Sequence, residues 1–300
     1  MAIINKFLLP VIAAIAPLGA MAQTGDNERF AVHVHARAGL DRAFGSSTTL
    51  PGMGRKSTLY NFGADFGWKF WQRDAHSLEA VIGVGYSPIT TTFDLGKLEY
   101  SYAAPATADE DADTYIRHYR LSNLKQRVKS GEVTIPLYAK YAYRCTEWMK
   151  VYADLGLQFG IGAFSKVTSQ SGEAFSYGVY PQYDNLMIDA DYLNDFGSRS
   201  VADAAWGKPR LNPFTASLLV GFGAEARIYG PFSAALGFNF IGRFNNVFKS
   251  IQYDPEAMTE ATAPLTYTVK EGSRLRALTD YLGASKLSQF SLTLSLIYHF

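Results

Sequence analysis

Two histidines near the start of the chain, His33 and His35, have the residue type and spacing that could bind a metal or move a proton. Residues two apart in a strand lie on the same face, so both imidazoles would point the same way. A metal site needs further ligands, and neither a Cys nor another spaced His accompanies this pair. We therefore expect a structural role, with a metal site as the less favoured alternative. His299 would join the pair only if the strand register brought it close.

The other candidates for catalysis lack partners in the sequence. Cys145 is the only cysteine, so it cannot form an internal disulfide, and residues 144–147 include no base that could activate its thiol. His118 is the one histidine placed to serve a protease-like Asp/His pair. We expect no enzymatic activity, no catalytic, cofactor-binding or metal site, and no cofactor.

Further charged residues occur at alternate positions in short stretches of the sequence. They would therefore lie on one face of each stretch, as the two histidines do. Acids and bases among them are nearly balanced. If this face is enclosed, the charges must pair, because burying a lone charge is costly. The predicted interior charge network comprises His33, His35, Arg37, Asp65, Lys69, Glu79, Lys140, Lys150, Asp154, Glu225 and Arg227.

The stretches that carry these charges alternate with a period of two, which is typical of β-strands. On every predicted strand the opposite face is apolar and free of charge. Glycines are frequent on the charged face and would leave room for long side chains. The predicted strands cover residues 30–40, 59–71, 77–87, 131–143, 148–164, 214–228, 232–241 and 287–300. Pro136 is unexpected inside a strand, because it lacks a backbone donor, and predicts a bulge or kink.

The connections between these strands alternate strictly between long and short. The long ones cover residues 41–57, 88–130, 165–211 and 242–286. Residues 95–102 and 115–124 could pair within a membrane and raise the strand count to ten, but we expect them to form a hairpin outside it. Asp189, Asp191 and Asp195 could hold Ca²⁺, although their spacing lacks the glycine of an EF-hand loop.

Composition and the N-terminus bear on the class of protein. The formal net charge is +1 and no basic stripe is present, so nucleic acid is not an expected partner. Lys6, an apolar stretch and the Ala20-Met21-Ala22 sequence predict a cleaved signal peptide over residues 1–22. Beyond it no run of 18 apolar residues occurs. We expect an exported chain with a single domain, residues 23–300.

Alternating faces, the rhythm of the connections and the aromatic ending at Tyr298 and Phe300 resemble the Gram-negative outer-membrane β-barrel (porin-like) proteins. The match is to the small eight-stranded size class of OmpA and OmpX. The resemblance implies an all-β, closed, antiparallel up-and-down transmembrane barrel in the cell outer membrane, with short periplasmic turns and four long extracellular loops. It also implies that Tyr298 and Phe300 form a C-terminal signal for the barrel assembly machinery.

An eight-stranded barrel is just wide enough to be filled by its own side chains. We therefore expect a structural or surface-interaction protein that contacts an extracellular ligand or protein through its loops. A small porin or narrow channel is the alternative, and a barrel hydrolase is less favoured. Basic residues of the segment 115–129 would meet phosphates of lipopolysaccharide.

Overall fold

The computed structural model describes residues 28–43, 49–190, 193–251, 253–282 and 287–300. The predicted signal peptide lies outside these ranges. No helix within them is both long and apolar enough to cross a membrane. Short 3₁₀ helices occur at η2 (Ala106–Ala108), η3 (Pro181–Tyr183), η4 (Val201–Asp203) and η5 (Leu278–Tyr281).

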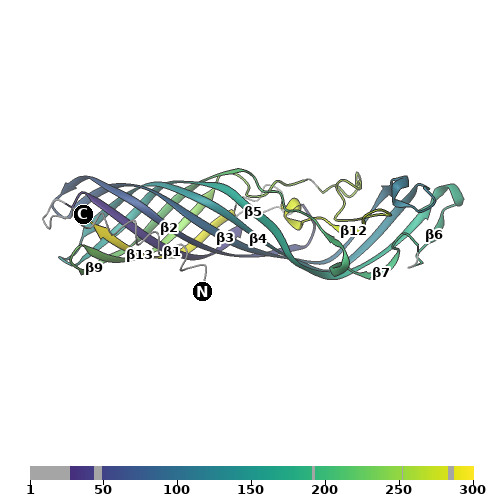
Figure 1. The fold of residues 1–300 in the computed structure, drawn as a ribbon, viewed down its shortest axis with the longest axis horizontal. Coiled ribbons are helices and arrows are strands. Elements are labelled where there is room, and N and C mark those ends of the chain that lie inside the picture. Colours follow the sequence, from purple (N-terminus) through teal and green to yellow (C-terminus); the bar gives the residue numbers. More distant parts are fainter. Residues whose placement is uncertain (1–27, 44–48, 191–192, 252, 283–286) are drawn as a thin grey trace.

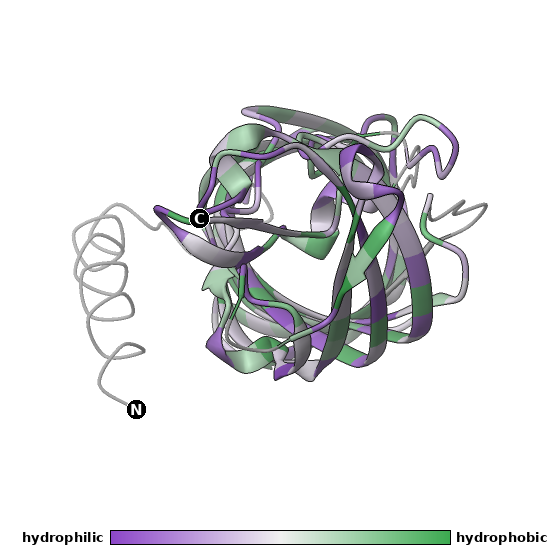
Figure 2. Ribbon diagram, turned by 90° about the vertical axis from the view of Figure 1, so that its right-hand side faces the viewer, coloured by the Kyte–Doolittle hydropathy of each residue, from purple (hydrophilic) through white to green (hydrophobic). Residues whose placement is uncertain are grey.

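Eight antiparallel strands form a ring in which each strand pairs with two neighbours. The order around the ring is β1-β2-β3-β4-β5-β9-β10-β13, and β13 pairs with β1. Figure 2 shows this ring end-on, with hydrophilic and hydrophobic residues alternating along the strands. The strands are β1 (Phe30–Ala43), β2 (Met53–Arg73), β3 (His76–Ala104), β4 (Tyr115–Arg144), β5 (Met149–Tyr180), β9 (Phe214–Tyr229), β10 (Phe232–Arg243) and β13 (Leu287–His299).

Three strands are much longer than the sequence pattern predicted. β3, β4 and β5 have 29, 30 and 32 residues and continue past the ring as a sheet. With short elements packed on it, this sheet forms what we call the projection, which makes the molecule elongated (Figure 1). Those elements include β6 (Leu186–Ile188) and β7 (Gly197–Ser200), which both pair with β5, and a small sheet of β8 (Ala205–Trp206), β11 (Leu265–Thr268) and β12 (Gly272–Leu275).

The segments 95–102 and 115–124 do pair, with Leu95 opposite Leu124 and Tyr102 opposite Arg117. They are the continuations of β3 and β4 into the projection, so they add no strands to the ring. The predicted long connections 88–130 and 165–211 are therefore wrong in part, because much of each is strand.

The ring carries its apolar residues on the outside. Phe62, Leu155 and Leu294 are 48%, 61% and 61% exposed, whereas Asp65 and Lys140 on the inner face are 3% and 4% exposed. Alternation on a strand makes this arrangement possible, since one face can be wholly apolar and the other wholly polar. A water-soluble protein would place the same residues the other way round.

The projection has the opposite arrangement. Its buried residues form one large apolar cluster that includes Phe93, Leu95, Tyr119 and Leu121, while Arg120 faces outward and is exposed. Between ring and projection, the alternation of buried and outward residues shifts by one position on β3 and on β4. On β3 the buried positions run from Phe93 to Leu95 and then resume at Leu98. On β4 the shift occurs at Asn123, whose φ is +51°.

Pro136 is accommodated without the predicted bulge. The β3–β4 register is the same on both sides of it, from Ile82–Leu137 to Gly85–Thr134, and no pairs occur between these two. The missing donor of Pro136 therefore falls where the ladder is already interrupted, while Pro136 stays paired with Gln158 on β5.

Candidate functional site

The interior of the ring holds most of the predicted charge network in a buried state. His33, His35, Arg37, Asp65, Glu79, Lys140 and Glu225 are each at most 8% exposed. Lys69, Lys150 and Asp154 are partly buried, and Arg227 is exposed at the end of the ring that carries the short turns. We call this end the mouth.

The two histidines bind carboxylates rather than sharing a ligand. His33 Nε2 lies 3.0 Å from Glu79 Oε1, and His35 Nδ1 lies 3.2 Å from Asp65 Oδ2. The other ring nitrogen of His35 is 2.9 Å from Asn61 Oδ1. His35 is thus held by the neighbouring strand β2, and His33 by β3, which lies one strand further round the ring.

Glycines on the adjacent strand give these carboxylates room. A Cβ at Gly67 would lie 1.5 Å from Glu79 Oε1, and one at Gly83 would lie 1.8 Å from Asp65 Oδ1. Any side chain at these two positions would displace the carboxylate from its histidine.

Glu225 is the centre of a cluster near the mouth. Lys140 Nζ and Lys150 Nζ lie 3.2 Å and 3.4 Å from its two oxygens, and His299 Nε2 lies 3.0 Å from Oε1. Lys140 also lies 4.4 Å from the centre of the Tyr152 ring. A buried carboxylate with three cationic or titratable partners is well compensated, which a lone one would not be.

His299, Ser233 and Glu225 are the residue types of a catalytic triad, but their geometry does not form one. Ser233 Oγ and Glu225 Oε1 both approach the same nitrogen, Nε2, at 3.3 Å and 3.0 Å. A triad needs the acid on one ring nitrogen and the nucleophile on the other, so that the imidazole can pass a proton between them. This cluster can hold charge but is not arranged to activate the hydroxyl.

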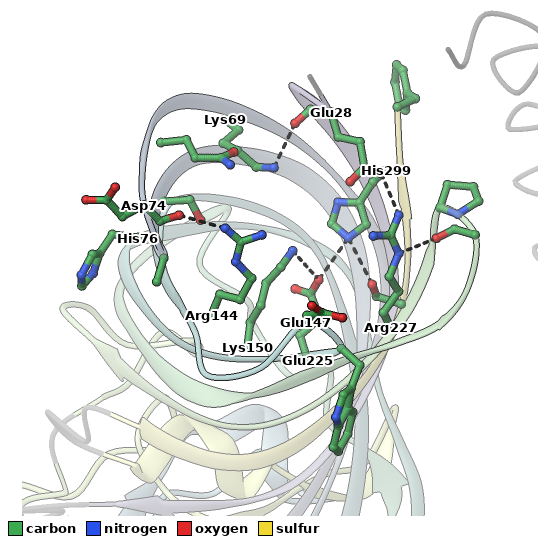
Figure 3. A pocket seen from close by; sticks show the side chains of 18 residues that line it. Glu28, Lys69, Asp74, His76, Arg144, Glu147, Lys150, Glu225, Arg227 and His299 are labelled. Atoms are coloured by element: carbon green, nitrogen blue, oxygen red, sulfur yellow. Dashed lines mark hydrogen bonds and ion pairs between the residues drawn. The ribbon is translucent and has the colours of Figure 1, made fainter. Parts of the chain in front are cut away.

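The mouth opens into a cavity of about 380 Å³. Figure 3 shows Lys69, Lys150, Arg227 and His299 around it, with Glu28 at its edge. Lys69 Nζ donates to the backbone oxygen of Glu28 at 2.9 Å, and Arg227 Nη2 lies 3.2 Å from Glu28 Oε1. The cavity is therefore lined by charges of both signs that are largely engaged with each other.

The sequence analysis missed an ion pair at the opposite end of the interior. Arg243 Nη2 lies 2.6 Å from Glu132 Oε2, and both side chains are about as buried as any charged pair in the described residues, at 2% and 1% exposure. Arg243 also donates to Thr215 Oγ1 at 3.2 Å. Glu132 has the same parity as Lys140 and lay within the predicted strand 131–143, but it was not included in the predicted network, whereas Arg243 lay in a predicted connection.

Some interior polar atoms lack a protein partner. Within the described residues, Arg37 Nε and Asp154 Oδ1 are buried and make no hydrogen bond, and Arg37 reaches Gln158 Oε1 only at 3.5 Å. Buried polar groups of this kind are ordinarily satisfied by ordered water. The interior is thus packed with side chains but has places for water.

The remaining sequence candidates lie in the projection or on the surface. His118 stacks on Tyr177 at a centroid distance of 4.6 Å, and no carboxylate contact is recorded for it in the described ranges. Cys145 is exposed in a turn. Asp195 is engaged by Arg199 and Ser273, and Asp191 lies outside the described residues. Across those residues no group of three or more potential metal ligands occurs.

The projection also contains a buried cation, Arg117, which contacts several of its segments. Its guanidinium lies over the rings of Tyr119, Phe196 and Tyr267, at 5.1, 4.8 and 4.7 Å from their centres. It also donates to the Tyr115 hydroxyl at 2.9 Å. Burial raises the pKa of Tyr119 to about 12, so the surrounding phenols stay neutral. Cation–π contacts and hydrogen bonds hold this charge in place of a carboxylate.

No protein-family model and no curated protein matches the chain. Solved structures do show a likeness. They include Ail, the attachment invasion locus protein of Yersinia pestis (9% identity, covering 91% of this chain and 99% of that one, TM-score 0.31). They also include the translocator domain of the autotransporter NalP from Neisseria meningitidis (10%, 100% and 97%, 0.27) and the outer membrane protease OmpT from Escherichia coli (8%, 93% and 99%, 0.25). The predicted resemblance to outer-membrane β-barrel proteins is therefore also found among structures, at TM-scores too low to carry a functional argument.

Proposed function

We propose that this chain is an integral β-barrel protein of a Gram-negative outer membrane, which acts as a structural or surface-interaction protein through its projection. The observation that carries the proposal is the apolar outer face of the ring. Exposed Phe62, Leu155 and Leu294 belong to a belt that is far larger than the apolar patches of soluble monomers. The ring of paired strands also meets the requirement that no unpaired backbone edge face hydrocarbon.

The orientation follows from the lengths of the connections. Short turns and the C-terminal residue lie at the mouth, which we assign to the periplasm, and the projection then stands on the extracellular side. In this orientation Tyr298 and Phe300 are placed at the periplasmic end, where the barrel assembly machinery would read them. Segments connecting the ring strands on the other side form the extracellular portion.

The packed interior supports a structural role over a channel. Buried pairs such as Glu132 with Arg243 and Glu225 with Lys140 cross the ring and hold strands that are far apart in the sequence. An eight-stranded ring leaves little space beyond its own side chains. A narrow channel is the second candidate, because the cavity at the mouth and the unpartnered atoms of Arg37 and Asp154 leave room for water.

A surface for an extracellular partner is available at the far tip of the projection. Tyr183 of η3 and Leu186 and Met187 of the edge strand β6 are 53%, 50% and 61% exposed, and Figure 1 places β6 at the end of the molecule opposite the C-terminus. Exposed apolar residues on a rigid support are typical of protein contact sites. A ligand or protein outside the cell would meet this surface first.

Two measurements test the proposal. Refolded protein should run as a compact band on a denaturing gel without heating and shift after boiling, because a closed membrane barrel resists detergent. Recordings in planar lipid bilayers should give no steady single-channel steps. An unshifted band would contradict the barrel, and regular conductance steps would favour the channel over the filled interior.

A further inference from the structure

A group of exposed cations lies on the outer wall at the boundary between ring and projection. We call Lys56, Arg127, Lys129 and Lys166 the basic patch; they come from β2, β4 and β5. Lys56 and Arg127 both lie opposite Thr92 of β3, and Lys129 lies opposite Thr90. The patch therefore spans four neighbouring strands.

The charges of the patch are not balanced by the protein. Lys129 and Lys166 are directly opposite each other across the β4–β5 pair. Like charges in this position repel and destabilise a sheet. Within the described part of the chain none of the four cations forms an ion pair, whereas the nearby Lys125 lies 3.8 Å from Asp94. An anion that lies between the cations would relieve this repulsion.

The height of the patch indicates which anion that is. Gly131 is the next outward-facing residue below Lys129 on β4, about 7 Å along the strand. It is covered by Tyr86 and Phe164, since a Cβ there would lie 2.6 Å from Tyr86 Oη and 2.5 Å from Phe164 Cε1. These two aromatic residues end the apolar belt, as aromatic residues do where hydrocarbon meets the headgroups.

Below the patch the wall is suited to acyl chains. Val84, Ile161 and Phe164 are 55%, 48% and 41% exposed. Beside the cations, Thr90, Thr92 and Ser169 offer hydroxyls as cross-strand partners. A ligand that rests on this wall would therefore have hydrocarbon below and a phosphate, carried on a hydroxylated headgroup, above.

We propose that the basic patch binds a phosphorylated glycolipid of the surrounding leaflet, with its phosphate between Lys129, Lys166 and Arg127. This inference rests on the proposed membrane location. On the far side of the ring the strands do not extend far enough to present a matching surface: β10 ends at Arg243 and β9 begins at Phe214. The bound lipid would therefore lie on one side of the barrel, beneath the sheet of the projection.

The test uses refolded full-length protein in a zwitterionic detergent, with bis-phosphorylated lipid A and the same lipid A after enzymatic removal of its phosphates. Retained lipid is measured by native mass spectrometry. A triple variant, Arg127→Gln/Lys129→Gln/Lys166→Gln, is compared with a control, Lys97→Gln/Arg120→Gln. The control removes two cations that lie higher on the projection and pair with Glu99.

We expect the wild type and the control to prefer the phosphorylated lipid roughly tenfold or more, because each cation near the lipid surface strengthens the attraction to a phosphate. The triple variant should lose this preference, and added salt should weaken it in the wild type. Equal retention of both lipids by the wild type, or an unchanged preference in the triple variant, would overturn the proposal. Thermal unfolding provides a second comparison. If inorganic phosphate alone stabilised the protein as much as the phosphorylated lipid does, the proposal would also be overturned.

This result is separable from the proposed function. A protein that fails the heat-shift test is not a membrane barrel, and the proposed function fails with it. A protein that passes that test and treats the two lipids alike contradicts only the lipid site.

Discussion

The ring and the projection are built from the same strands but bury opposite kinds of residue. On β4, Lys140 points inward in the ring and Leu137 outward, whereas in the projection Leu121 points inward and Arg120 outward. Both regions consist of paired antiparallel strands, so the surroundings rather than the type of secondary structure account for the reversal. If the ring lies in a membrane as proposed, each region is adapted to its own surroundings, hydrocarbon around the ring and water around the projection.

The largest expected effect comes from breaking the charged interior of the ring. Glu132→Leu leaves Arg243 buried without its carboxylate, which should lower the free energy of unfolding by about 3–5 kcal/mol. The double variant Glu132→Leu/Arg243→Met should recover much of that loss. Urea unfolding in lipid vesicles provides the measurement. Equal stability of the single variant and the wild type would show that the pair is not enclosed.

The projection should respond to loss of apolar volume instead. Leu121 is fully buried, so Leu121→Ala should destabilise the projection by about 2–5 kcal/mol through the lost contacts and the cavity. Limited proteolysis should then cut the projection while the ring stays protected. Simultaneous loss of the heat-shifted band would mean that the two regions do not have separate cores.

A charge on the outer wall distinguishes the two solvents directly. Leu155→Arg places a charge in the apolar belt and should cost about 2–4 kcal/mol near the bilayer midplane. Ala103→Arg places the same side chain on the exposed outer face of the projection and should change stability by less than about 0.5 kcal/mol. Folding yields in vesicles of both variants would be compared. Similar losses of folding yield for the two variants would contradict a boundary between hydrocarbon and water on the outer wall.

The smallest effect concerns pH and the projection alone. Burial lowers the pKa of His118, so the folded state favours the neutral imidazole. Its contribution to stability is therefore present above the unfolded value of 6.5 and is lost as the pH falls through the lower folded pKa. Protection of the projection from hydrogen exchange should decrease from about pH 8 to about pH 5. His118→Phe, which keeps a ring against Tyr177, should remove part of that decrease, and an identical decrease would rule out this cause.

The alternation of side chains was enough to predict the strands of the ring and the faces of Phe62 and Asp65. It failed above the ring for a physical reason. From Leu95 to Leu98 the spacing of buried residues changes from two to three, so no single period runs through β3. The outward face also becomes polar there, which resembles a loop in composition. The predicted strands therefore stopped short of the projection.

The candidate site was predictable in its composition and not in its pairing. Parity placed Glu79 and Lys140 inside the ring, but which histidine meets which carboxylate depends on register, and register is set by turns and bulges. Glu225 could be assigned to the interior, while its contact with His299 required the closure of β13 on β10. Arg117 gave no sequence signal, because two of the aromatic rings that enclose it, those of Phe196 and Tyr267, come from distant segments.

Spin labels test the central claim most directly. Cys145 is exposed and can be replaced by Ser, after which single cysteines are introduced at Phe62, Leu155, Leu294, Thr92 and Arg120 and labelled in vesicles. Labels at the first three positions should collide more with oxygen, which concentrates in hydrocarbon, and those at Thr92 and Arg120 with a water-soluble nickel complex. If Phe62, Leu155 and Leu294 were instead accessible to the nickel complex, the apolar wall would not face lipid and the account would be contradicted.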